Sequence, residues 1–262
     1  MIKLISEKEK TDFKYLEKSH YSRKIISHND AYGTKYDFCS FYFVYSGVEK
    51  LGVISLFNNA MVAEAYEGKS FNGEAVRDMA FLINAHKPQT VELSPKYAAE
   101  LIKYVESDYS LGERHQFEFV CRNKLPELEV NEFPKLDEVF DILKTGFPDL
   151  EPCYGAWLTD TSHRVRRGFA QAFILNKCTT ATIQYIIYGK ALIGQVATLP
   201  EYRGRKYARQ LLYWIGEKLN KDGITVYLFA RNHRKSYYEE IGFKEISIDY
   251  VLDRKREENV SG

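Results

Sequence analysis

The sequence lacks the features that would indicate a membrane span, a secretion signal or a disulfide framework. No uninterrupted apolar run in the 262 residues approaches the roughly 20 residues that cross a bilayer. The first ten residues, MIKLISEKEK, lack the apolar core of a signal peptide. Cys39, Cys121, Cys153 and Cys178 are scattered without C-x-x-C spacing. We therefore expect a protein of the reducing cytoplasm, with no structural metal and no membrane partner.

An excess of charge of either sign is also missing. The chain has 37 basic and 36 acidic residues; 17 of each fall in residues 1–125, which leaves 20 basic and 19 acidic for residues 126–262. Neither half has the basic excess that binding to a phosphate backbone needs, so nucleic acid is not an expected partner. Because domains commonly hold roughly 100 to 150 residues, the length predicts two domains, residues 1–125 and 126–262.

The most informative stretch of the sequence is residues 190–212. Residues 191–199 form a short β-rich run that ends at Pro200, and from Lys206 the apolar spacing becomes helical, which predicts strand, turn and helix. A helix that begins there directs its first free N–H groups and its positive dipole end outward, which suits a phosphate or pyrophosphate. The alternative is a solvated basic turn. The turn contains Arg203, Gly204, Arg205 and Lys206.

Two motifs here resemble those of the GNAT family of N-acetyltransferases. The run V-A-T-x-P-x-Y-R-G-x-x-x-A resembles the family's acetyl-CoA-binding segment, Arg/Gln-x-x-Gly-x-Gly/Ala. Arg203 takes its first position and Ala208 its last, whereas Lys206 stands where the family has glycine. About 30 residues later, YYEEIGF resembles the family signature L/F-Y-x-x-x-G-F. The resemblance implies an α/β (α+β) fold with a mixed, mainly antiparallel sheet flanked by helices.

The resemblance also implies where acetyl-CoA would bind. The pantetheine would pair with the backbone of Val196, Ala197 and Thr198, for which an ordinary sheet ladder is the alternative. Asn232 would contact the cofactor, or act only as an N-cap. The pyrophosphate would lie on the N–H groups of the turn and of the first helical residues. These residues are Arg203, Gly204, Arg205, Lys206, Tyr207 and Ala208.

The catalytic groups are less completely defined by the sequence. Tyr238 matches the family tyrosine that donates a proton to the departing thiolate, although a packed aromatic is the alternative. Gln195 lies near the expected position of an acid but cannot accept a proton, so the base is an acid elsewhere or a water relay. The loop and helix that would line the acceptor site offer four candidates, unless they form an ordinary surface loop. The candidates are Glu151, Tyr154, Trp157 and Asp160.

The N-terminal half resembles a second, degenerate copy of the same domain. A helix over residues 6–18, strand runs at 38–47, 50–59 and 60–68 and a helix over 73–86 follow the family's order of elements. No cofactor motif follows the third run, so we expect acetyl-CoA only in the C-terminal half. The N-terminal half would line the acceptor pocket or form a homodimer contact.

The function expected from these features is transfer of an acetyl group from acetyl-CoA to a primary amine of a small molecule. A non-catalytic acyl-CoA-binding or regulatory protein is one alternative. An aminoacyl transferase that takes its acyl group from charged tRNA is another, which the balanced charge disfavours. The acceptor itself is not evident from the sequence.

Overall fold

The computed structural model describes residues 1–9, 13–120 and 127–255. Cys121 and the expected domain boundary at residues 125 and 126 lie outside these ranges. The chain forms two compact units, Met1–Arg114 with Ile248–Gly262 (unit 1) and His115–Ser247 (unit 2). Strands β6 (Tyr109–Phe119) and β12 (Phe243–Arg254) each contribute residues to both units. These limits differ from the predicted boundary at residue 125, because the end of the last strand belongs to unit 1; the division into two domains remains a prediction.

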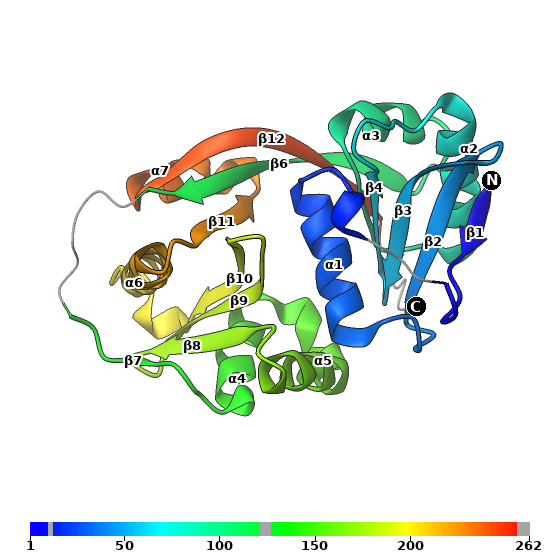
Figure 1. The fold of residues 1–262 in the computed structure, drawn as a ribbon. Coiled ribbons are helices and arrows are strands. Elements are labelled where there is room, and N and C mark those ends of the chain that lie inside the picture. The colour runs from blue at the N-terminus through cyan, green and yellow to red at the C-terminus, as the bar shows by residue number, and fades with distance from the viewer. Residues whose placement is uncertain (10–12, 121–126, 256–262) are drawn as a thin grey trace, which may run out of the picture. The chain divides into compact units, whose positions relative to one another are not determined.

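Unit 1 is built on a mixed sheet in the order β1-β2-β3-β4-β5-β12 (Figure 1). β2 (Cys39–Ser46), β3 (Glu49–Phe57) and β4 (Ala60–Ala65) form an antiparallel meander. β5 (Thr90–Glu92) then pairs in parallel with the start of β4. A strand parallel to its predecessor needs a crossover, and the helix α2 (Gly73–His86) supplies it. The expected strands and this helix are confirmed.

Helices cover both faces of this sheet. Alternate residues of a strand point to opposite faces of the sheet, so each face can be covered separately. α2 and α3 (Pro95–Leu101) bury apolar residues such as Met79, Ile83 and Leu101 against one face. α1 (His20–Tyr32) lies against β3 and β4. The short strand β1 (Ile2–Leu4) pairs with β2 at one edge.

The helix expected over residues 6–18 is wrong for its described part. Glu9 accepts hydrogen bonds from the Ser6 amide and hydroxyl, as a capping box would, but only a short 3-10 turn, η1 (Phe13–Tyr15), follows. The helix instead begins at His20, with Ser19 as its N-cap. Between η1 and Ser19, Leu16 forms an isolated antiparallel bridge with Tyr66, directly after β4.

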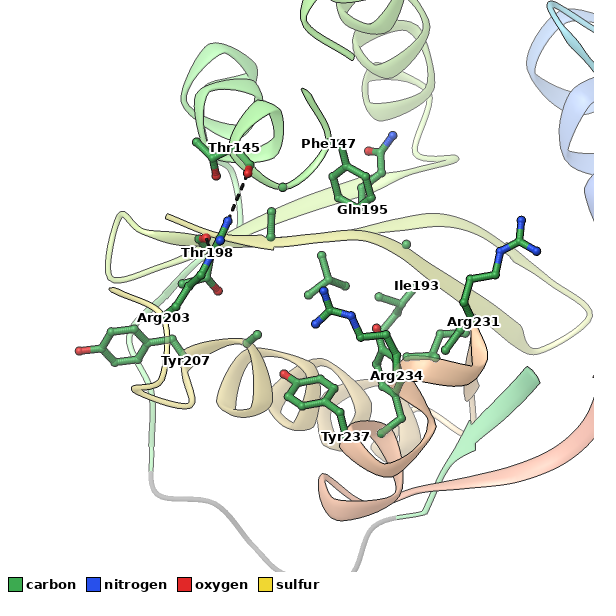
Figure 2. A pocket seen from close by; sticks show the side chains of 18 of the residues that line it. Thr145, Phe147, Ile193, Gln195, Thr198, Arg203, Tyr207, Arg231, Arg234 and Tyr237 are labelled. Carbon is green, nitrogen blue, oxygen red and sulfur yellow. Dashed lines mark hydrogen bonds between the residues drawn. The ribbon is translucent and has the colours of Figure 1, made fainter. Parts of the chain in front are cut away.

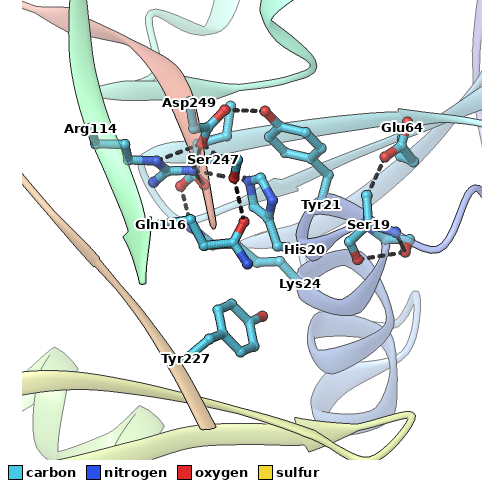
Figure 3. A network of polar contacts seen from close by, with 12 residues as sticks. Ser19, His20, Tyr21, Lys24, Glu64, Arg114, Gln116, Tyr227, Ser247 and Asp249 are labelled. Carbon is cyan, nitrogen blue, oxygen red and sulfur yellow. Dashed lines mark hydrogen bonds and ion pairs between the residues drawn. The ribbon is translucent and has the colours of Figure 1, made fainter. Parts of the chain in front are cut away.

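A buried ionic network holds α1 to the sheet within unit 1 (Figure 3). The Arg114 guanidinium donates to Asp249 and to Glu92, each at 2.6 Å, while Lys24 of α1 pairs with Glu92. His20 Nε2 lies 3.2 Å from Asp249 Oδ2, and Tyr21 donates its hydroxyl proton to the same carboxylate. Burial alone would raise the pKa of Glu92, but Arg114 and Lys24 hold it below its ordinary value. The charges of this interior are therefore paired.

Unit 2 repeats the arrangement of strands and helices. Its sheet has the order β6-β11-β10-β9-β8-β7, and β8 (Gln171–Leu175), β9 (Thr179–Ile187) and β10 (Lys190–Thr198) form its antiparallel meander. The helix α6 (Tyr207–Lys221) leads to β11 (Thr225–Ala230), which is parallel to β10. The edge strand β7 is only Val130–Asn131.

The helices of unit 2 also pack on both faces of the sheet. Leu211, Leu212 and Ile215 of α6 pack on one face. α4 (Leu136–Gly146) and α5 (Tyr154–Arg166) bury Leu143 and Trp157 on the other, joined by the 3-10 segment η2 (Pro148–Cys153). The 3-10 turn η4 (Asn232–Arg234) and α7 (Lys235–Glu240) precede β12. None of the helices in the described ranges is long and apolar enough to cross a membrane.

Candidate functional site

The site is formed where β10 and β11 separate. Their parallel register begins at Lys190↔Thr225 and ends at Leu192↔Tyr227. From Ile193 onward, the edge of β10 that faces β11 has no strand partner among the described residues. On its other side, β10 is bulged against β9 between Gly194 and Ala197. A bulge bends and twists its strand, so the end of β10 diverges from β11.

The bulge depends on two local conformations. Gln195 adopts a φ of 53°, which non-glycine residues rarely do. A Cβ at Gly194 would lie 2.4 Å from Nε2 of Gln184, so the Gln184 side chain packs here in space that a larger residue would take from it. Trp157 of α5 directs its indole N–H toward Gln195 Oε1 at 3.4 Å. Strain of this kind is concentrated at functional sites.

The start of α6 presents backbone donors without intrahelical acceptors. The first bond of the helix runs from the Gln210 amide to the Lys206 carbonyl at 3.0 Å, so the amides of the first turn have no acceptor within it. Lys206, the N-cap, makes no side-chain cap and lies in the left-handed region with φ 64° and ψ 17°. This conformation explains why the family motif has glycine there, because only glycine adopts it without strain.

Arg203 anchors the turn to its surroundings. Its Nε donates to the Thr198 carbonyl at 3.2 Å, and one guanidinium nitrogen donates to the Thr145 carbonyl at 3.1 Å (Figure 2). The guanidinium thus bridges the end of β10 to the last turn of α4. Its position indicates a bracing role in addition to any screening of a phosphate.

These elements surround a pocket of about 880 Å³. Eight of the ten expected cofactor contacts line it, namely Val196, Ala197, Thr198, Arg203, Gly204, Lys206, Tyr207 and Ala208. Arg205 and Asn232 are exposed and are not part of the lining; the Arg205 guanidinium instead lies 5.3 Å from the centre of the Tyr202 ring. The volume suits an extended ligand the size of a coenzyme.

Tyr238 lies in this pocket on α7. Its ring packs against Phe117 and Phe243, with centroid distances of 5.7 and 5.9 Å. No described residue forms a hydrogen bond with its hydroxyl. Burial raises the pKa of Tyr238 to about 12, an effect that Arg234 opposes. The phenol is therefore protonated at neutral pH and can act as a proton donor.

The residues expected at the acceptor site do not line this pocket. Glu151 is exposed on η2, and Tyr154 donates its hydroxyl proton to Asp137. Asp160 accepts from Arg164 Nε at 2.7 Å, one turn along α5. None of these, nor Trp157, lines the pocket, and no Asp or Glu does among the described residues. The lining side chains thus offer no carboxylate base, although they include the imidazole of His233.

Comparison with known proteins agrees with this geometry. The acetyltransferase (GNAT) domain model matches residues 156–245. This part of the chain is a GNAT acetyltransferase domain. No curated protein matches the sequence.

Solved GNAT structures share the fold over most of the chain. A GCN5-related N-acetyltransferase from Sphaerobacter thermophilus is 14% identical with a TM-score of 0.61, over 88% of this chain and 84% of that one. A GNAT acetyltransferase from Colwellia psychrerythraea is 10% identical with a TM-score of 0.57, over 98% and 100%. A tandem GNAT protein from the clavulanic acid biosynthesis pathway is 13% identical with a TM-score of 0.56, over 82% of each chain.

Several residues of the GNAT pocket were not predicted from the sequence. The end of α4 and the loop after it form one wall, through Thr145, Gly146, Phe147 and Pro148. Arg231, His233 and Arg234 form part of the opposite wall. Among these residues, the glycine at position 146 is a signal that the sequence offers, because a glycine can permit a close approach of two elements. In the structure a Cβ there would lie 3.2 Å from the Ala197 side chain. The three basic residues carried no such signal, because they adjoin a motif that does not include them.

Proposed function

We propose that unit 2 transfers an acetyl group from acetyl-CoA to a primary amine of a small molecule. One observation carries this proposal: the unpaired edge of β10, the free amides of the first turn of α6 and the hydroxyl of Tyr238 share one pocket. The first two features suit an extended amide-containing ligand with a pyrophosphate. The third suits a leaving group that needs a proton.

In the proposed reaction each pocket feature has one task. The backbone from Val196 to Thr198 aligns the donor, and the amides at the start of α6 bind its pyrophosphate. The amine nitrogen bonds to the acetyl carbon as the carbon–sulfur bond breaks. Tyr238 gives its proton to the sulfur, and the proton lost by the amine returns to the tyrosine through water. The products are an N-acetylated amine and a neutral thiol.

Unit 1 is proposed to bind no acetyl-CoA. At the end of β4, where β5 no longer pairs, the Glu17 amide donates to the Ala65 carbonyl at 3.0 Å. The Glu67 amide donates to the Tyr15 carbonyl at 2.8 Å. The chain thus fills, with its own residues, the edge that is open in unit 2.

A non-catalytic acyl-CoA-binding protein is the second candidate. It is favoured by the pocket lining, in which no carboxylate among the described residues is placed to take a proton from the amine. Turnover with any amine would exclude it.

Two measurements separate these candidates. Melting of the protein is followed with and without acetyl-CoA, because a ligand at about 100 times its dissociation constant adds roughly 2.7 kcal/mol of stability. Release of free thiol is then followed with a panel of primary amines. A rise in melting temperature with amine-dependent thiol release supports the enzyme, whereas a rise without turnover supports the binding protein. No rise at all would contradict both.

A further inference from the structure

The charge of the pocket is strongly one-sided. Arg203, Lys206, Arg231 and Arg234 line it, and the lining contains no carboxylate among the described residues. The chain as a whole is almost neutral, with 37 basic and 36 acidic residues. The cations of the pocket are therefore a local feature and not a consequence of composition.

These cations are divided between two parts of the pocket. Figure 2 shows Arg203 beside Thr198 at one end of the pocket and Arg231 at the other, beyond Ile193, with its guanidinium directed away from Arg234. Arg234 lies between them, beside Tyr237. The start of α6 and its free amides belong to the end with Arg203, where the proposed pyrophosphate is already supplied with donors. Arg231 and Arg234 are thus additional to that site.

Both arginines lie in the short segment between β11 and α7, the helix that carries Tyr238. Arg231 directly follows β11 and lines the pocket. Arg234 precedes α7, which carries Tyr238, and its charge lowers the pKa of both Tyr237 and Tyr238 against the larger, raising effect of burial. A guanidinium at this position binds carboxylate or phosphate well and repels an ammonium group.

We propose that the acceptor is a primary amine whose molecule also carries a carboxylate or phosphate, and that Arg231 and Arg234 bind this anionic group. The inference rests on the proposed acetyl transfer. It excludes polyamines and other polycations as substrates, because they would bring ammonium groups against the cations. The same charges favour the neutral form of the reacting amine, since a nearby like charge lowers the pKa of an ammonium group. The pocket can therefore supply a nucleophile without a carboxylate base.

The test compares acceptors that differ in one acidic group. The pairs are glutamate with glutamine, aspartate with asparagine and phosphoserine with serine, and spermidine is the polycation. We expect the acidic member of at least one pair to be acetylated about tenfold or more faster in kcat/KM, and spermidine not to be acetylated. Arg231→Met and Arg234→Met should remove that preference, raising KM for the acid, while Arg→Lys at the same positions should restore part of it.

Measurements with the acetyl donor show whether the arginines bind the donor or the acceptor. Affinity for acetyl-CoA and for acetyl-3′-dephospho-CoA is measured in each variant. Unchanged affinities support the proposal, whereas a loss confined to acetyl-CoA would assign the arginines to the donor's 3′-phosphate and overturn it. Preference for spermidine would also overturn the proposal. So would a result in which no acidic amine reacts and none raises the melting temperature of the coenzyme A complex. Failure of acetyl-CoA itself to bind would instead show that the proposed acetyl transfer is wrong.

Discussion

The starts of helices α2 and α6 occupy equivalent places in the two units, between a meander and a parallel strand, but they differ in what their amides contact. Asn72 caps α2 and accepts the Ala75 amide at 2.9 Å, and Glu74 supplies an acidic group in the first turn. The cap of α6 is Lys206, with no side-chain bond, and its first turn has no acidic residue. One helix start has a side-chain cap, and the other has none.

The strands and tyrosines beside these helices differ in the same way. The end of β4 pairs with Leu16, whereas the end of β10 lines a pocket. The hydroxyl of Tyr97 on α3 accepts the Phe71 amide at 3.1 Å, whereas no described residue bonds to the hydroxyl of Tyr238 on α7. The same topology therefore yields a closed structure in unit 1 and an open site in unit 2, and local polar contacts decide which.

The largest effect is expected from the charged residues, when the buried ion pairs of unit 1 are compared with the exposed Arg234 of the pocket. Arg114→Met leaves the buried Glu92 and Asp249 without their shared partner and should lower the free energy of unfolding by about 3 to 5 kcal/mol. Arg234→Met removes an exposed charge of the pocket and should change it by less than about 0.5 kcal/mol. Urea unfolding measures both. Equal losses would show that the distinction between the two sets of charges is wrong.

The second-largest effect is expected at the equivalent tyrosines of the two units, Tyr238 and Tyr97. Tyr238→Phe removes the proposed proton donor and should lower kcat about a hundredfold with little change in acetyl-CoA affinity. Tyr97→Phe removes a buried hydrogen bond and should cost about 1 kcal/mol of stability without changing kcat. Steady-state kinetics and thermal melting give the two readouts. An undiminished kcat in Tyr238→Phe would exclude it as the proton donor.

The two helix caps should respond in opposite directions. Lys206→Gly relieves a left-handed conformation and should raise stability by about 1 kcal/mol. Asn72→Ala removes a cap and should lower stability by about 1 kcal/mol. Chemical denaturation of both variants checks the signs. A destabilised Lys206→Gly would mean that the lysine side chain makes a contact more valuable than the strain.

The smallest effect is the pH dependence of the network in unit 1. Burial lowers the pKa of His20 below its ordinary value of 6.5, although Asp249 opposes the shift. Near pH 6.5 the His20 imidazole is therefore protonated in the unfolded chain more than in the folded chain. The free energy of unfolding should fall as the pH drops below about 6.5. Unfolding free energies between pH 5 and 8 measure this slope. His20→Asn should flatten it, and an unchanged slope would assign the effect to another group.

The sequence predicted the elements better than the site. Apolar periodicity located the meanders and α2, and the two motifs located α6 and Tyr238, because these patterns act within a few residues of each other. The helix expected after Ser6 failed because pairing of Leu16 with Tyr66 overrides local preference. Glu151 and Asp160, expected near the acceptor, do not line the pocket, because the orientation of a helix on a sheet depends on packing that one sequence does not reveal. Packing of the same kind brings Arg231 and Arg234 into the pocket lining, so the sequence did not indicate them either.

The most direct test of the difference between the two helix starts is the stoichiometry of acetyl-CoA binding by isothermal titration calorimetry. Ala208→Glu gives α6 an acidic residue at the position that Glu74 occupies in α2; the helix dipole favours it, but the carboxylate repels a pyrophosphate. Glu74→Ala is the matched control in unit 1. We expect one acetyl-CoA per chain in the wild type and in Glu74→Ala, and none in a folded Ala208→Glu. Undiminished binding in Ala208→Glu, or two sites per chain, would contradict this expectation.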